Sequence, residues 1–252
     1  MIRGKTFIST RPAGRSEELR EFFSEQGAEL LEMPMIDIRR AELTDNEKEV
    51  LRRAGSFDWI VFTSSNGVIH FFGHLKDLTG SYETGRDTKI AVIGRDTGSG
   101  LSRFAHEAHY TGKGSTGEAF SAELRELFTG KNPGVLLPAG NLARGTVEEG
   151  LKGIAEVFRI NVYNTEMPRN INYEVLKFVQ DDKYEMIIFT SSSGFNNFCL
   201  AAKDRISLDS LRIACIGSVT AETVMQRGIK PLVTAQKMNS SGIAEAIMNY
   251  YR

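Results

Sequence analysis

Short, continuous runs of apolar residues recur along the chain, and each run leads into a polar turn or an amphipathic stretch. Because these runs do not alternate with polar residues, they are typical of strands covered on both faces, as in a parallel sheet with helices on each side. The predicted strands are Thr6–Thr10, Glu29–Met33, Trp59–Thr63, Lys89–Ile93, His109–Tyr110, Val135–Leu137, Glu156–Ile160, Met186–Thr190, Arg212–Ile216 and Pro231–Thr234. The amphipathic stretches predict helices at Ser16–Gln26, Thr116–Phe128, Thr146–Ile154 and Ser241–Tyr250.

The pattern occurs twice. The segment "FDWIVFTSSNGV" is matched by "YEMIIFTSSSGF" 127 residues later, and "TKIAVIGRDT" is matched by "LRIACIGSVT". The segments "AELLEM" and "AEVFRI" are also 127 residues apart. The chain therefore reads as a short unit with two strands, a long unit with three strands, and a second copy of each.

One short and one long unit together make a five-stranded, doubly wound parallel sheet of the flavodoxin type. The 252 residues have room for two such α/β domains. The sequence does not decide whether the first short unit joins the first or the last long unit. The segments "MPMIDIRRAE" and "INVYNTEMPRN" fall at equivalent points, and we interpret them as linkers because Pro34 and Pro168 interrupt any helix there.

Composition and charge narrow the class of protein. Apolar residues make up 41% and charged residues 25% of the chain, and the net charge is −1. We therefore expect no nucleic-acid partner and no membrane partner, so that local groups must hold any anionic ligand. The opening residues contain no apolar run typical of a signal peptide, and we expect a cytoplasmic location. The two cysteines, Cys199 and Cys215, are interpreted as packing in a helix and a strand.

Turns rich in hydroxyl groups follow the strands of both long units. In a parallel sheet, ligands gather at the carboxyl ends of the strands, where the helices begin. Small hydroxyl residues there cap a helix and leave other N–H groups free, and the helix N-terminus favours anions. A plain structural cap is the alternative for each turn. The candidate binding residues in these turns are Thr63, Ser64, Ser65, Asn66, Thr190, Ser191, Ser192, Ser193, Gly194, Ser218 and Thr220.

Four such turns, two in each long unit, favour a shared ligand site. They follow the predicted strands Trp59–Thr63, Lys89–Ile93, Met186–Thr190 and Arg212–Ile216. If both domains present them to one cleft, the cleft would suit a large ligand with several carboxylates. A phosphate is less suitable, because neither a GxxxxGK[ST] nor a GxGxxG motif occurs. Arg11, Arg95 and Arg144 lie in turns after strands, and a guanidinium can pair bidentately with a carboxylate. A solvated surface arginine is the alternative for each.

The histidines give a weaker signal. His70 and His74 are four residues apart on a predicted helix, as in many zinc pairs. No HExxH glutamate accompanies them and no third ligand is near in the sequence, so we interpret both as solvated helix residues. No metal site is predicted.

Several motifs occur together, in order: the opening "STRP", then "VFTSSNGV", "VYNTE", "IIFTSSSG" and "IGSVTAE…GIKPLVTA". With the internal duplication and the length, this combination resembles the uroporphyrinogen-III synthase family, from Ile8 to the last helix. The sequence departs from the family's pattern at three points. Ser192 stands where the family often has a proline, and Arg95 and Ser218 stand where a proline is common after the Ile-Gly pair.

The resemblance implies two flavodoxin-like domains joined by a two-stranded linker, because the chain leaves the first domain, builds the second and returns. The implied domains are residues 1–36 with 168–252, and residues 42–162, with linkers at 37–41 and 163–167. It implies cyclisation of hydroxymethylbilane, a small-molecule substrate with eight carboxylates, to uroporphyrinogen III with ring D inverted. It also implies a monomer that uses no cofactor and no metal.

Tyr163 matches the tyrosine of the family's linker, which is the implied proton donor to the departing hydroxyl group. A hinge-packing tyrosine is the structural alternative. Two other classes of function stay open at this point. The first is a non-catalytic, two-lobed protein that binds a small organic anion, since fold does not fix function. The second is a nucleotide-sugar transferase, which the missing phosphate loop makes the weaker alternative.

Overall fold

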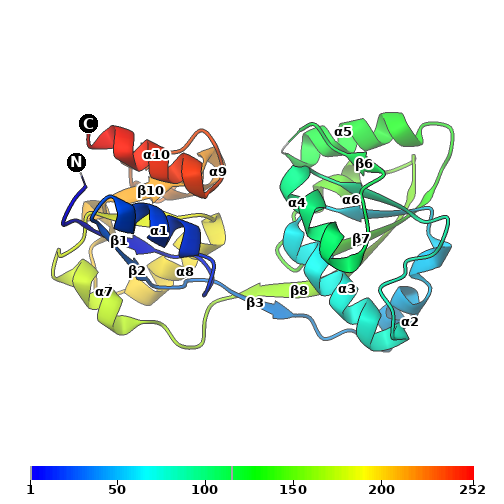
Figure 1. Cartoon of the computed structure of the whole chain (residues 1–252), viewed down its shortest axis with the longest axis horizontal. Coiled ribbons are helices and arrows are strands. Elements are labelled where there is room, and N and C mark those ends of the chain that lie inside the picture. Colours follow the sequence, from blue (N-terminus) through cyan, green and yellow to red (C-terminus); the bar gives the residue numbers. More distant parts are fainter. Residues whose placement is uncertain (1, 115) are drawn as a thin grey trace. The chain divides into compact units, whose positions relative to one another are not determined.

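A computed structural model describes residues 2–114 and 116–252 of the chain (Figure 1). These residues form two compact units, residues 2–38 with 166–252, and residues 39–165. We call them the first and second units. The chain thus passes from one unit to the other twice.

The first unit contains a five-stranded sheet with the order β11-β10-β9-β1-β2. Every strand pair in it is parallel. Its first two strands come from the start of the chain and the other three from the end, in the order 2-1-3-4-5 that defines the flavodoxin type. The strands are β1 (Thr6–Ser9), β2 (Glu29–Glu32), β9 (Met186–Phe189), β10 (Ile213–Cys215) and β11 (Val233–Thr234).

The second unit has the sheet order β3-β8-β7-β4-β5-β6. The pairs from β8 to β6 are parallel. Counted from β7, these five strands again follow the order 2-1-3-4-5, so this unit is a circular permutation of the first. Its strands are β3 (Asp37–Arg40), β4 (Trp59–Phe62), β5 (Lys89–Val92), β6 (Tyr110–Thr111), β7 (Gly134–Gly140) and β8 (Glu156–Glu166). The α/β class with two flavodoxin-like sheets is therefore confirmed.

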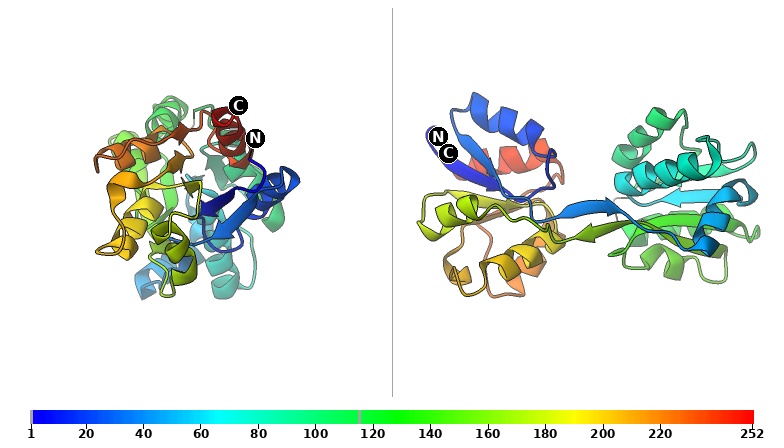
Figure 2. Two further views of the ribbon diagram at one scale, coloured as in Figure 1. Left: turned by 90° about the vertical axis from the view of Figure 1, so that its left-hand side faces the viewer. Right: turned by 90° about the horizontal axis from the view of Figure 1, so that it is seen from below.

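Helices cover both faces of each sheet, as Figure 2 shows. In the first unit, one face carries α7, α8 and α9, and the other carries α1 and α10. In the second unit, one face carries α2 and α3, and the other carries α5 and α6. The bounds are α1 (Glu17–Glu25), α2 (Asp45–Arg52), α3 (Ser65–Thr79), α4 (Arg95–Ser99), α5 (Gly117–Phe128), α6 (Thr146–Gly150), α7 (Tyr173–Gln180), α8 (Ser192–Ala202), α9 (Ser218–Met225) and α10 (Ser240–Tyr250).

The apolar runs are continuous because successive strand residues enter opposite cores. In β9, Ile187 and Phe189 pack toward α8, whereas Met186 and Ile188 pack toward α1 and α10. All four side chains are fully buried. At about 2 kcal/mol for each buried apolar side chain, such strands contribute much of the stability of the unit. Cys199 on α8 and Cys215 on β10 are buried among the same residues, as the sequence predicted.

Several elements differ from the sequence-based expectation. Helix α7 was not predicted, and β7 extends to Gly140, three residues beyond the expected Leu137. Helix α2 was not predicted, although Thr44 and Glu47 form a reciprocal capping box at its start. Helix α6 ends at Gly150, four residues early, and the chain continues in turns. Strand β8 runs on to Glu166, well beyond the expected Ile160, because β3 supplies a second neighbour there: Ala41 N donates to Val162 O at 3.2 Å.

Candidate functional site

The turns after β4 and β9 have the same geometry. Ser64 and Ser191 are the N-caps of α3 and α8, and their φ angles are both −160°. Each hydroxyl oxygen accepts a hydrogen bond, from Gly67 N and from Gly194 N, at 3.0 Å. The serines thus cap their helices, while the other N–H groups of the first turn have no partner within the helix.

The turns after β5 and β10 begin with glycine. Gly94 and Gly217 are the N-caps of α4 and α9, in extended conformation and with no side-chain hydrogen bond to the helix. The surroundings of the two glycines differ. A Cβ atom at Gly94 would meet nothing within 4 Å, whereas one at Gly217 would lie 2.9 Å from the Met238 side chain. Met238 therefore covers the turn at Gly217 in the first unit, whereas the equivalent turn at Gly94 in the second unit is open.

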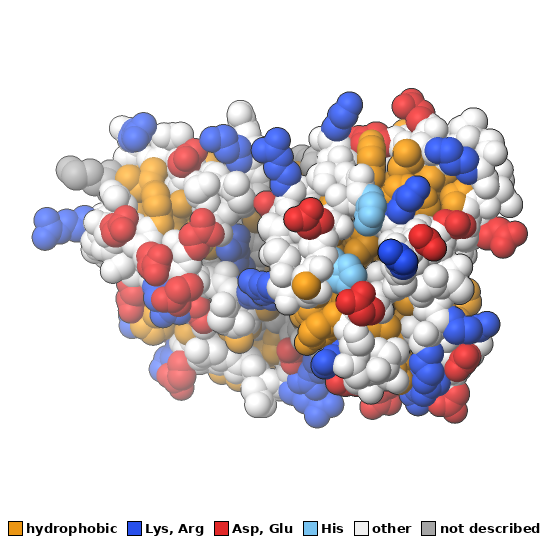
Figure 3. Space-filling model, turned by 45° about the vertical axis from the view of Figure 1, so that its right-hand side comes forward, with side chains coloured by type: hydrophobic (Ala, Val, Ile, Leu, Met, Phe, Trp, Pro, Cys, Tyr) orange, Lys and Arg blue, Asp and Glu red, His pale blue; other side chains and the backbone are white. Residues whose placement is uncertain are grey.

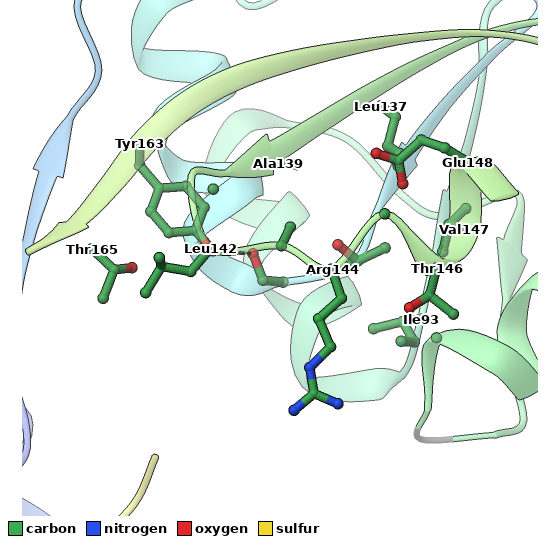
Figure 4. Close-up of a pocket in the computed structure, with 16 residues that line it drawn as sticks. Ile93, Leu137, Ala139, Leu142, Arg144, Thr146, Val147, Glu148, Tyr163 and Thr165 are labelled. Atoms are coloured by element: carbon green, nitrogen blue, oxygen red, sulfur yellow. Dashed lines mark hydrogen bonds between the residues drawn. The ribbon is translucent and has the colours of Figure 1, made fainter. Parts of the chain in front are cut away.

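A hollow of about 340 Å³ lies at the carboxyl ends of β4 and β7 in the second unit (Figure 4). We call it the Tyr163 hollow. It brings four of the predicted site residues together: Thr63, Ser64, Arg144 and Tyr163. The other lining residues come from β5, β7, β8, the β7–α6 loop and the starts of α5 and α6: Ile93, Gly117, Leu137, Ala139, Gly140, Leu142, Ala143, Gly145, Thr146, Val147, Glu148 and Thr165.

The position of Tyr163 follows from an irregularity in β8. Ala139 pairs with Asn161, but the next residue, Gly140, pairs with Tyr163, so that β8 carries one extra residue there. Such a bulge turns a side chain in a new direction. The phenol oxygen lies 3.2 Å from Ser64 Oγ, and the ring stacks on His70 with 5.6 Å between the ring centroids. Two neighbours from α3 and its cap thus hold the ring.

Gly140 makes this position possible. A Cβ atom built on it would lie 2.5 Å from Cζ, 2.6 Å from Cε2 and 2.8 Å from the oxygen of Tyr163. No real Cβ approaches another atom so closely, so only glycine leaves room for the ring. Figure 4 shows the Tyr163 ring beside the β7–α6 loop, with Leu142 next to it.

The interpretation of His74 as a solvated residue was wrong. Its side chain is 5% exposed, and Nε2 donates to Val162 O at 3.1 Å. Nδ1 then accepts from Arg40 Nε at 2.9 Å, and Arg40 also pairs with Asp77. Burial and the Arg40 charge lower the pKa of His74 to about 4, so the ring is neutral at pH 7. The sequence could not show this, because its partners lie on β3 and β8. His70 is partly buried against Tyr163 and is not a fully solvated residue either.

The arginines of the short units have different surroundings. Arg144 is exposed at the rim of the Tyr163 hollow, and its guanidinium points away from the β7–α6 loop (Figure 4). Arg11 is half-buried and donates to Ser240 Oγ at 2.8 Å and to Arg15 O at 3.2 Å. Burial lowers the pKa of the Arg11 guanidinium, although Glu18 opposes the effect. Arg11 thus connects the β1–α1 loop to α10, whereas Arg144 is available to a ligand.

The remaining predicted residues lie at strand ends outside the Tyr163 hollow. In the second unit, Ser65 donates to Asp96 O, Asn66 lies in the first turn of α3, and the exposed Arg95 lines a neighbouring hollow with Lys113. In the first unit, Ser192 is bonded to Thr223 at 2.7 Å, Ser193 to Ser191 at 3.2 Å, and Ser218 is exposed. Thr190 is partly buried, and Gly194 and Thr220 are buried. The hydroxyl groups of Ser192 and Ser193 are therefore already engaged within the protein.

Three residues that shape the hollow were missed in the sequence: Gly140, which lines it, and His70 and Arg159, which contact residues of its lining. His70 lies three residues after Gly67 and six after Ser64, a spacing that places it on the helix face toward the turn, and this signal was available. Gly140 and Arg159 carried no local signal, because their importance arises from contacts between β7 and β8.

Neither a helix able to span a membrane nor a group of metal-ligating side chains occurs in residues 2–114 and 116–252. Figure 3 shows acidic and basic side chains interspersed over one face of the molecule.

A family model described as uroporphyrinogen-III synthase HemD matches residues 17–245. A putative uroporphyrinogen-III synthase from Methanothermobacter thermautotrophicus is 30% identical over 87% of this chain and 88% of its own length. A uroporphyrinogen-III synthase from Synechococcus elongatus is 25% identical over 99% of this chain and 96% of its own. The porphyrin biosynthesis protein HemD of Ruminiclostridium josui is 27% identical over 97% of this chain, which spans only 48% of that relative.

Solved structures agree in fold. The mutant uroporphyrinogen III synthase from Thermus thermophilus superposes with a TM-score of 0.67 at 15% identity, covering 98% of both chains. The uroporphyrinogen-III synthetase from Helicobacter pylori gives 0.62 at 16% identity, covering 97% of this chain and 99% of its own. Since the family model covers nine-tenths of the sequence, the chain belongs to the uroporphyrinogen-III synthase family.

Proposed function

We propose that this protein cyclises hydroxymethylbilane to uroporphyrinogen III, with inversion of ring D and loss of water. The observation that carries the proposal is the position of Tyr163 beside Ser64 in a hollow at the strand ends, in a chain that belongs to this family. The reaction needs an acid near the leaving hydroxyl and a surface that holds a polycarboxylate in a fixed shape.

The first step breaks the carbon–oxygen bond of the hydroxymethyl group on ring A. The lone pair of the ring A nitrogen supplies electrons, which leaves an azafulvene cation, and the departing hydroxide takes a proton to become water. Tyr163 is the residue proposed to donate that proton. Its hydroxyl lies 3.2 Å from Ser64 Oγ, so the serine orients the phenol and can return a proton to it. A general acid contributes about 10²–10⁴-fold.

The second step is carbon–carbon bond formation by ring D. Its substituted α-carbon attacks the cation to give a spiro intermediate, and the bond of that carbon to the neighbouring methylene group breaks and re-forms at the other α-carbon. Loss of the proton from the final position restores the aromatic pyrrole. Each of these steps depends on the conformation of the bilane, and positioning can supply about 7–11 kcal/mol.

Backbone amides are proposed to bind most of the carboxylates. The residues proposed to contribute are those in the turns after β4, β5, β9 and β10, with Thr63, Arg95 and Arg144 in the second unit. The support is that the caps at Gly94 and Gly217 use no side chain and that Ser64 and Ser191 each bond one amide of their helix. Arg11 is proposed to contribute indirectly, through the loop that it holds.

Three finer statements belong to the same proposal. The protein is proposed to act as a monomer, since each unit buries its own core on both faces of its sheet. It is proposed to act in the cytoplasm, without nucleic-acid or membrane partners, since its net charge is −1. The linkers are proposed to be residues 37–41 and 163–167.

The isomer of the product tests the proposal. Hydroxymethylbilane is made fresh from porphobilinogen with a deaminase, incubated with the protein, oxidised, and the porphyrin isomers are separated. We expect mainly type III isomer, and type I isomer from heat-denatured protein, because the bilane closes to type I on its own. Type I isomer alone with the native protein, together with saturable binding of the bilane, would instead identify a non-catalytic binding protein.

A further inference from the structure

Arg159 holds the β7–α6 loop by three contacts. This residue of β8 pairs with Glu148 of α6, with 2.9 Å between Nη1 and Oε1. Its Nη2 atom donates to two carbonyl oxygens of the loop, Gly140 O at 3.0 Å and Ala143 O at 3.1 Å. One guanidinium thus fixes both ends of a short stretch of backbone and the first turn of the helix that follows.

The loop that Arg159 holds forms one wall of the Tyr163 hollow. Residues 140–145 supply Leu142, which is 58% exposed, and the exposed Arg144. A second contact is made by Asn141, whose Oδ1 accepts from Thr165 N at 2.8 Å. Two backbone bonds also hold the loop, from Asn141 N to Tyr163 O at 3.2 Å and from Ala143 N to Gly140 O at 3.1 Å. Arg159 is the side chain from another element that reinforces these contacts.

Only arginine can make this set of contacts. Its planar group presents several donors in a fixed arrangement, so it can bind a carboxylate on one side and two carbonyls on the other. A lysine ammonium keeps the charge and can pair with Glu148, but it is a compact point charge without the fork. The side chains of Arg159 and Glu148 are 31% and 25% exposed, so water competes only partly for these bonds.

The duplication indicates that the contact is not a requirement of the fold. In the repeat, Arg159 corresponds to Glu32, since "AEVFRI" aligns with "AELLEM". Glu32 has the opposite charge and pairs with Arg20 of α1. The first unit therefore builds the same sheet without an arginine at this position, and the arrangement is special to the unit that contains Tyr163.

We propose that Arg159 is a positioning residue, which holds the loop so that Arg144 meets a carboxylate of the substrate. The part that concerns the substrate rests on the function proposed above, and the part that concerns the loop does not. Arg159 itself lies outside the lining of the hollow and acts through the loop.

The test compares Arg159→Lys, Arg144→Ala and the double variant. In Arg159→Lys, we expect hydrogen exchange of the amides at 141–145 to become about ten-fold faster, the effect of one or two lost bonds to a charged group. Exchange in β4 and β9 should stay unchanged and serves as the internal control for folding. Unchanged exchange at 141–145 would overturn the proposal.

Kinetics with the bilane test the second part. We expect KM to rise about ten-fold in Arg159→Lys and in Arg144→Ala, with kcat changed less than about three-fold. The KM of the double variant should be no higher than that of the more strongly affected single variant. Independent, multiplying effects of the two substitutions would overturn the link to Arg144. If the wild-type protein forms only type I isomer, the proposed function fails, while the exchange result still decides the role of Arg159 in the loop.

Discussion

Replacement of Gly140 by alanine tests how far the reaction depends on the position of Tyr163. The added Cβ would lie 2.5 Å from Cζ of the ring, where a normal carbon–carbon contact is about 3.5 Å, so the ring must move by roughly 1 Å. Gly140 has no positive φ angle, so the substitution strains no backbone of its own. The perturbation is therefore limited to the tyrosine and its contacts.

A displacement of this size removes the phenol from its place. The 3.2 Å separation from Ser64 Oγ would exceed hydrogen-bonding distance if the ring moved away along that line. A misplacement of about 1 Å at a catalytic group can cost on the order of 100-fold in rate. We expect Gly140→Ala to lower kcat about 10- to 100-fold, with a smaller change in KM. Overpacking of this kind also costs about 1–3 kcal/mol of stability.

The assay is the initial rate of type III isomer formation, measured beside thermal unfolding. Gly73→Ala is the matched control, because a Cβ at Gly73 meets nothing within 4 Å and alanine favours the interior of α3. In a Tyr163→Phe background, Gly140→Ala should cause no further loss, since the hydroxyl is already absent. A wild-type rate for Gly140→Ala in a folded protein would refute the argument that the ring must lie where it does.

Two further predictions follow from the surroundings of His74 and of the two loop arginines. Because the pKa of His74 is lowered to about 4 in the folded protein, the unfolded chain binds the proton first as pH falls. The free energy of unfolding should therefore fall between about pH 6.5 and pH 4, by at most about 1.4 kcal/mol per pH unit from this group. Urea unfolding at several pH values should show that the free energy of unfolding of His74→Gln depends less on pH in this range. An unchanged pH dependence would mean that another group causes the loss of stability. Arg144→Ala should raise KM without lowering the melting temperature. Arg11→Ala should lower the melting temperature by several degrees, because the substitution removes the bonds to Ser240 and Arg15. Equal melting temperatures for the two variants would contradict the difference assigned to the two arginines.

The apolar runs and their repetition predicted the fold because both can be recognised from the sequence without knowledge of tertiary contacts. Each predicted run overlaps a strand of the structure. The inner strands, such as Met186–Phe189, are covered on both faces, whereas the edge strands β2, β6 and β11 are partly exposed. The pairing of short and long units was not predictable. Buried parallel strands all consist of similar apolar residues such as Val, Ile and Phe, so the sequence of a strand does not show which strand it pairs with. Only the resemblance to a family supplied that information.

Site residues were predictable where their role depends on a local turn, and they were not predictable where their role depends on contacts with elements distant in the sequence. The serines at 64 and 191 cap helices as their position after a strand suggested. The burial of His74 depends on Arg40 and on a carbonyl of β8, 88 residues away, and no local pattern contains it. The same holds for Gly140, whose missing side chain matters only because a bulge in β8 places Tyr163 opposite it.

The central claim is that the shape of the binding surface, and not the acid, selects the isomer. The most direct test is the isomer composition formed by Tyr163→Phe with the protein in excess over the bilane. We predict that the variant forms product about 10- to 100-fold more slowly than wild type, and that the product formed above the spontaneous background is still type III. A variant that accelerates closure but yields type I isomer would contradict the claim, because Tyr163 would then direct the ring inversion itself.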